Sequence, residues 1–98
     1  MRQRPPWASK YDDPILEFLQ ETDAALPPAV VEFNLDRKNI ASPAYSTVKR
    51  RMRKLAKHGL LNNLEEKEGY YEITDKGRDY LNAELDISEL TEDNSPYE

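Results

Sequence analysis

The sequence predicts a mainly helical α+β domain in which a three-helix core is followed by a β-hairpin and a C-terminal helix. Apolar residues recur at helical spacing in three segments that each begin beside a proline. Two short apolar runs flanking a charged turn follow them, and a capped helical segment comes last. The 98 residues allow one modest core. We expect this domain over residues 11–86, after a flexible N-terminal arm at 1–10 and before an acidic C-terminal tail at 87–98.

The first helix is expected to begin at Asp12 and Asp13 and to end near Ala24. The two aspartates offer N-cap oxygens, and Pro14 suits the first turn because its missing N–H is not needed there. The apolar stripe of this helix comprises Ile15, Leu16, Phe18 and Leu19. Trp7, ahead of the helix, is expected to pack against the edge of the domain.

A short second helix is expected from about Pro28 to Asn34. It carries three large apolar residues, namely Val30, Val31 and Phe33. The polar stretch 35–41 is expected to be a turn, with the alternative that Ile40 enters a short strand at the edge of a small sheet. Such a short helix cannot be stable alone and must pack against its neighbours.

A third helix is expected from Pro43 to His58. Ser42 is the predicted N-cap, and Gly59 supplies a left-handed C-cap. Its core stripe repeats at helical spacing and comprises Val48, Met52 and Leu55. The basic and hydroxyl-bearing residues between them must therefore point outward.

The hairpin is expected from two runs, Leu60 to Leu64 and Tyr70 to Ile73, that flank the charged turn 65–69. Because side chains alternate along a strand, one of the two adjacent tyrosines enters the core and the other faces solvent or DNA. Thr74 and Asp75 then cap a last helix. The packing side of that helix is expected to comprise Gly77, Tyr80, Leu81 and Leu85.

Charge is strongly segregated along the chain. The net charge is −5, yet residues 36–57 contain eight basic side chains and one acidic one, so this stretch carries +7 and the remainder −12. Such segregation indicates that one element meets a polyanion, whereas the alternative is a solvated basic helix face. The acidic remainder also resembles the adaptation of proteins from salt-loving cells, with an ordinary acidic protein as the alternative.

Composition excludes several classes of function. The chain has no cysteine and a single histidine, His58, so thiolate metal sites, disulfides and cysteine or histidine nucleophiles are excluded or undersupplied. The acidic pairs Asp12–Asp13 and Glu65–Glu66 are better explained as a cap and a turn than as catalytic groups. We expect no enzyme activity, cofactor, metal or small-molecule ligand. No leader or membrane-spanning stretch is evident, which predicts a cytoplasmic location.

Two stretches carry a family resemblance. SPAYSTVKRRMRKLAKHGLL resembles the recognition-helix stretch of winged helix-turn-helix regulators, and YYEITDKGRDYL resembles their second wing strand and following helix. DDPILEFLQETDAALPPAVVEFNL adds a resemblance to the archaeal phage-repressor-like (phi-H repressor type) proteins of halophiles. The resemblance covers about residues 7–90. It implies a winged helix-turn-helix fold, binding of double-stranded DNA as a repressor or small regulator, and a homodimer.

The resemblance places the third helix in the major groove of DNA. The matching positions are Ser42, Tyr45, Ser46, Thr47, Lys49, Arg50 and Arg53. An arginine fork can pair with guanine O6 and N7, so we expect Arg50 to read a base, with Arg53 as the second choice. Ser46 and Thr47 contact DNA or satisfy backbone groups at the helix start.

The remaining candidates are expected to contact phosphates without reading sequence. Lys49, Lys54 and Lys57 are the predicted phosphate contacts on the helix, and Tyr45 either donates to a phosphate or packs sideways. Lys67 is the only credible phosphate contact in the wing, because its turn also contains three glutamates, and the alternative is a solvated turn.

The basic helix also fits two other kinds of partner to different degrees. A winged-helix protein-interaction module could grip an acidic partner through it, because fold alone does not decide between partners. Double-stranded RNA fits less well, because its deep, narrow major groove admits side chains poorly.

Overall fold

The structure, a computed structural model, describes residues 6–83 of the chain. Its elements are α1 (Asp12–Thr22), α2 (Pro28–Arg37), α3 (Tyr45–Lys57), β1 (Leu61–Asn63), β2 (Tyr71–Ile73) and α4 (Asp75–Leu81). This order confirms the predicted class, a three-helix core with a hairpin and a further helix. The predicted packing residue Leu85 and the predicted tail at 87–98 lie outside the described residues.

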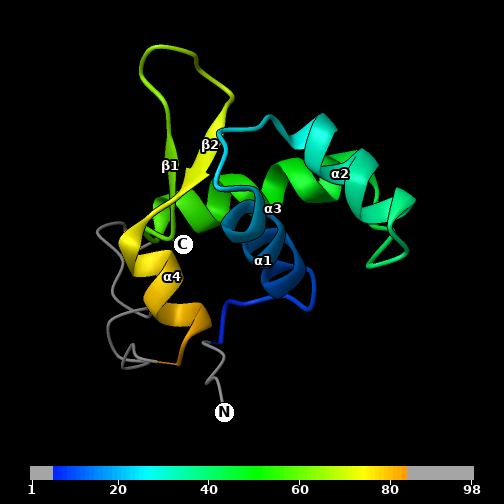
Figure 1. The fold of residues 1–98 in the computed structure, drawn as a ribbon, viewed down its shortest axis with the longest axis horizontal. Coiled ribbons are helices and arrows are strands. Elements are labelled where there is room, and N and C mark those ends of the chain that lie inside the picture. The colour runs from blue at the N-terminus through cyan, green and yellow to red at the C-terminus, as the bar shows by residue number, and fades with distance from the viewer. Residues whose placement is uncertain (1–5, 84–98) are drawn as a thin grey trace.

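The helices surround α1, which contacts α2, α3, α4 and β2 (Figure 1). In Figure 1, α3 passes behind α1, and the hairpin projects away from the helices at one end of the molecule. The two strands pair antiparallel, with Leu61 opposite Ile73 and Asn63 opposite Tyr71. The hairpin lies beside the C-terminal half of α3 (Figure 1), and β1 is in contact with α3.

The apolar stripes predicted for α1 and α3 form one core, whereas Val30 and Phe33 of α2 are exposed. The core comprises Ile15, Leu16, Phe18 and Leu19 of α1, Val31 and Leu35 of α2, Val48, Met52 and Leu55 of α3, Leu60, Leu61, Tyr71 and Ile73 of the hairpin region, and Tyr80 and Leu81 of α4. The α3 residues Val48, Met52 and Leu55 are all fully buried, as their spacing predicts. Their burial fixes which side of α3 faces outward.

The start of α1 differs from the prediction. Tyr11 is its N-cap and makes no side-chain cap bond, whereas Asp12 and Asp13 lie inside the first turn. The Asp12 carboxylate is buried and binds Arg51, and that of Asp13 accepts a hydrogen bond from the Tyr80 hydroxyl at 2.8 Å. Both carboxylates thus serve tertiary contacts, which a local capping rule does not predict.

The end of α2 also differs. The helix continues to Arg37, beyond the predicted Asn34, because Leu35 lies one turn after Val31 and is fully buried. Ile40 is 51% exposed in the following turn, so the prediction that it enters a strand is wrong. Leu26 takes that place, since it exchanges two backbone hydrogen bonds with Tyr71, at 2.9 and 3.0 Å.

The start of α3 lies later than predicted. The helix begins at Tyr45 with Ala44 as its N-cap, and Ser42 instead donates a hydrogen bond to the Asp36 carboxylate at 2.8 Å. Pro43 is buried ahead of the helix. The exit is as predicted: Gly59 has a φ of +84°, which suits glycine, and the Leu60 N–H bonds to the Leu55 carbonyl across the helix end.

The last helix begins at the predicted cap. The Thr74 hydroxyl accepts from the Gly77 N–H at 3.0 Å and donates to the Gly59 carbonyl at 2.7 Å, so it ties α4 to the end of α3. Gly77 is buried, and a Cβ there would collide with the Leu60 carbonyl oxygen. Within residues 6–83, no helix is long and apolar enough to cross a membrane.

Candidate nucleic-acid interface

The outward side of α3 is a continuous basic surface. We define the outer face of α3 as its exposed residues at helical spacing, namely Ser46, Lys49, Arg50, Arg53 and Lys57. Thr47 and Lys54 are half-buried at its borders, and Tyr45 is exposed at its N-terminal end. Ser42 lies exposed before the helix, where its hydroxyl binds Asp36. The structure therefore brings nine of the ten predicted site residues to one helix or its entrance.

Five cationic side chains converge toward the C-terminal half of the helix. Arg50, Arg51, Arg53, Lys54 and Lys57 line an open hollow of about 570 Å³. Among residues 6–83, the side chains that line this hollow include no carboxylate. Such a concentration of positive charge raises the local concentration of polyanions and of their phosphate groups.

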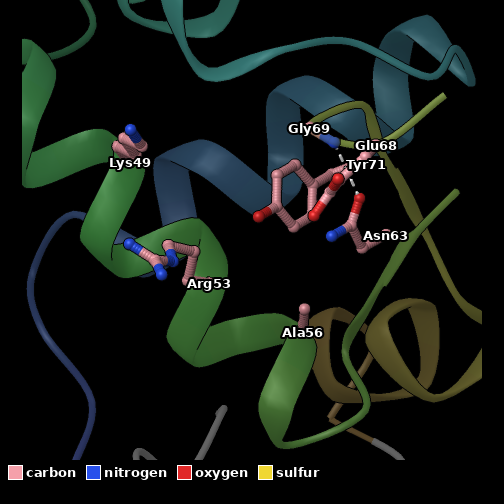
Figure 2. Close-up of a pocket in the computed structure, with 7 residues that line it drawn as sticks. All are labelled: Lys49, Arg53, Ala56, Asn63, Glu68, Gly69 and Tyr71. Carbon is pink, nitrogen blue, oxygen red and sulfur yellow. Dashed lines mark hydrogen bonds between the residues drawn. The ribbon is translucent and has the colours of Figure 1, made fainter.

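A second hollow lies between α3 and the hairpin, and we call it the wing groove. Lys49, Arg53 and Ala56 line it from α3, and Asn63, Glu68, Gly69 and Tyr71 line it from the hairpin. Figure 2 shows the Tyr71 ring between the two walls, with its hydroxyl directed toward the α3 side. The groove is open and holds about 430 Å³. Its α3 wall carries cationic side chains, and its hairpin wall carries polar and acidic ones.

Electrostatics in the wing groove act on Tyr71. Burial raises the pKa of its phenol, the positive charge of Arg53 opposes that shift, and the negative charge of Glu68 adds to it. The Asn63 side-chain oxygen accepts a hydrogen bond from the Gly69 N–H at 3.0 Å and so closes the turn that carries Glu68 (Figure 2). The charges of Arg53 and Glu68 thus act on the Tyr71 phenol in opposite directions.

Lys67, the tenth predicted site residue, does not join the others. It lies in the hairpin turn, and its ammonium is 5.0 Å from the centre of the Tyr70 ring. It does not line the wing groove. The structure thus separates Lys67 from the outer face of α3.

The family model described as winged helix-turn-helix phage repressor matches residues 1–93. The chain belongs to that family. The crystal structure of the PhiH1 repressor-like protein from Haloarcula marismortui is similar, with 41% sequence identity, a TM-score of 0.74, and coverage of 89% of this chain and 91% of that one. Comparison with curated proteins finds no match.

The side of α3 that faces the start of α1, which we call its inner side, carries Arg51, a residue whose role was not predicted from the sequence. Arg51 Nε and Nη2 bind the two carboxylate oxygens of Asp12, at 2.9 and 2.8 Å, and Nη2 also donates to the Trp7 carbonyl at 2.9 Å. The hydrogen bond to Asp12 raises the pKa of Arg51. A signal was present, because Arg51 follows Val48 by three residues and precedes Leu55 by four, which places it beside the core stripe.

The N-terminal segment is docked on the same side. Trp7 stacks on His58 with ring centroids 3.9 Å apart and planes 5° apart, which confirms that it packs on the domain. Ser9 donates its N–H to the Asp12 carboxylate at 2.9 Å. Within residues 1–10, where the sequence predicts a flexible arm, the described part from residue 6 thus lies against α1 and α3.

Metal chemistry finds no support in the part of the chain that the structure describes. Residues 6–83 contain no group of three or more histidine, cysteine, aspartate or glutamate side chains that could hold a metal ion. Asp12 and Asp13 are engaged with Arg51 and Tyr80. The charged surface that the described residues form is the outer face of α3.

Proposed function

We propose that this protein is a sequence-specific regulator that binds double-stranded DNA by inserting α3 into the major groove. The observation that carries the proposal is the outer face of α3, where cationic side chains stand on the helix that follows α2 in a winged helix-turn-helix domain. Membership of a phage repressor family supports repression as the direction of regulation. We propose a binding role and no catalytic one.

We assign Arg50 to base reading. It is exposed near the middle of the helix and does not line the wing groove, so its planar fork is free of the hairpin wall. Arg53 lines both hollows, which supports a role at a base edge or at a phosphate. Ser46 lies one turn before Arg50, on the same side of the helix, and Tyr45 beside it is placed to donate to a phosphate.

The other cations are assigned to the DNA backbone. Lys49, Lys54 and Lys57 present ammonium groups, which contact phosphates as point charges. Thr47 and Ser42 are assigned to the helix entrance, Thr47 because it is half-buried and Ser42 because it already binds Asp36. Lys67 remains a candidate for a separate phosphate outside the wing groove.

The proposed setting is the cytoplasm of a salt-rich cell, with the chain acting as a homodimer. The acidic remainder of the chain and a similar structure from Haloarcula marismortui support that setting. At about 1 M salt the Debye length is roughly 3 Å, so long-range attraction is largely screened. Close, directional contacts from Arg50 and Arg53 would then supply most of the binding.

The test is a titration of the protein with duplex from upstream of its own gene and with random duplex of equal length, both at the same salt concentration. Specific regulators bind their sites roughly 10³-fold or more tighter than random DNA. We expect a clear preference for the upstream duplex. Equal affinity for the two, or no binding, would refute the proposal.

The second candidate is a module that binds an acidic protein through the same helix. The acidic hairpin turn, with Glu65, Glu66 and Glu68, favours it, because these charges repel phosphates. Absence of DNA binding even at low salt, where phosphate contacts are strongest, would favour this candidate.

A further inference from the structure

The Tyr71 hydroxyl is an unused polar group in the wing groove. The residue as a whole is only 5% exposed, yet no other described residue makes a hydrogen bond to its hydroxyl. Although the ring is buried, the hydroxyl keeps contact with solvent in the open groove, so a ligand that enters the groove can reach it. Because burial raises the pKa of the phenol, the hydroxyl keeps its proton at neutral pH and remains a donor. The groove therefore presents a donor that has no acceptor among residues 6–83.

Two cations stand beside this donor. Lys49 and Arg53 are four residues apart on α3, so they are neighbours on one side of the helix, and both line the groove with Tyr71 (Figure 2). Two positive charges and a neutral hydroxyl donor suit an anion that has several acceptor oxygens. A backbone phosphate has this chemistry, and tyrosine, lysine and arginine are among its usual partners in DNA complexes.

Glu68 opposes these groups from the other wall. Its carboxylate lines the same groove, and its negative charge acts on the Tyr71 phenol against that of Arg53. It has no ion pair among the described residues. An anion that entered the groove would therefore meet two cations and one like charge.

We propose that the wing groove is a seat for one DNA phosphate, in which Tyr71 donates to a phosphate oxygen between Lys49 and Arg53, and that Glu68 weakens this seat. The inference rests on the proposed function, because it assumes that α3 lies on DNA. The hairpin then contributes to binding through its strand β2, although its tip is acidic. Glu68 sets the strength of that contribution through electrostatic repulsion.

The first test compares Tyr71→Phe with its neighbour Tyr70→Phe as the matched control. Tyr71→Phe removes the donor and keeps the buried ring, so we expect DNA to bind about tenfold more weakly, with the salt dependence unchanged because no charge is lost. Thermal unfolding should show both variants folded. Affinity equal to wild type for Tyr71→Phe would overturn the phosphate seat.

The second test compares Glu68→Gln with Glu66→Gln, which makes the same change of charge in the same turn but outside the groove. We expect Glu68→Gln to bind DNA about threefold to fivefold more tightly at low salt, and the gain to shrink as salt is added. Glu66→Gln should change affinity less. An equal gain from both variants would show that only the overall charge matters and would overturn the role of Glu68.

Failure of this inference is distinguishable from failure of the proposed function. Wild-type protein that binds no DNA removes both. Wild-type protein that prefers its own upstream duplex, while Tyr71→Phe and Glu68→Gln leave its affinity unchanged, keeps the function and removes the phosphate seat.

Discussion

Arg50 and Arg51 are neighbours in the chain and both line the basic hollow beside α3, but they make different contacts. Arg50 is exposed on the outer face, whereas the Arg51 side chain is only 13% exposed and binds Asp12 and the Trp7 carbonyl. The two residues contribute equally to the charge of the basic stretch. Their roles differ because one points away from the core stripe and the other lies beside it. Formal charge therefore overstates the positive charge that α3 offers to DNA in the proposed complex.

The inner side of α3 also ties the N-terminal segment to the helix. Arg51 contacts both α1, through Asp12, and the segment before it, through Trp7, which itself stacks on His58. The orientation of α3 relative to α1 thus depends on the inner side, and the proposed contact with DNA depends on the outer one. Substitutions on the two sides should separate stability from binding.

The largest expected effect comes from breaking the inner ion pair. Arg51→Ala leaves the buried Asp12 carboxylate without its charge partner, so the free energy of unfolding should fall by about 3–5 kcal/mol. Urea unfolding measures this loss. Arg50→Ala is the matched control and should stay within about 0.5 kcal/mol of wild type. Comparable loss in both variants would erase the distinction between the two arginines.

A double replacement sharpens the same comparison. Asp12→Leu combined with Arg51→Met removes both charges and keeps apolar volume, so its stability should be much closer to wild type than that of Arg51→Ala. If the double variant is as unstable as the single one, the ion pair is not the cause of the loss.

A smaller effect is expected from a phosphate contact on the outer side. Lys54→Ala should weaken binding to every duplex by about 1 kcal/mol, which is roughly fivefold. Because one phosphate contact is lost, the slope of log affinity against log salt should become shallower by about 0.9. Titrations at several salt concentrations measure this slope. A loss confined to one sequence would instead mark Lys54 as a base contact.

The smallest effect concerns Tyr71, where the inner core meets the wing groove. Its pKa is raised in the folded protein, so the associated stability is complete below the phenol's ordinary pKa of about 10 and is lost as the pH rises through the folded pKa. Urea midpoints measured from pH 9 upward should decline, and Tyr71→Phe should flatten part of that decline. An identical decline in the variant would contradict this assignment.

The sequence predicted the fold well because local patterns and the core agree. Helical spacing of apolar residues identified the core stripe of α3, and Thr74 and Gly59 were recognised as helix ends because capping is a local interaction. Asp12 and Ser42 were predicted as caps and are not. Both are polar residues whose partners, Arg51 and Asp36, are chosen by tertiary contact.

The candidate site was predictable as a helix face and not as a pair of hollows. Periodicity placed Lys49, Arg50 and Arg53 on the outward side of α3, as the structure has them. It could not show that Glu68 and Tyr71 stand opposite Arg53, because that arrangement depends on how the hairpin packs beside α3. Burial of Arg51 required the same three-dimensional information.

The measurement that tests the central claim most directly is the DNA preference of Arg50→Ala. Wild type and variant are titrated, at one salt concentration, with the upstream duplex, with duplexes that differ from it by one base pair, and with random duplex. We predict that the variant stays folded, loses about 1–3 kcal/mol on the upstream duplex and no longer discriminates at one base pair. Unchanged discrimination at every position would contradict the claim that the outer face of α3 reads DNA through Arg50.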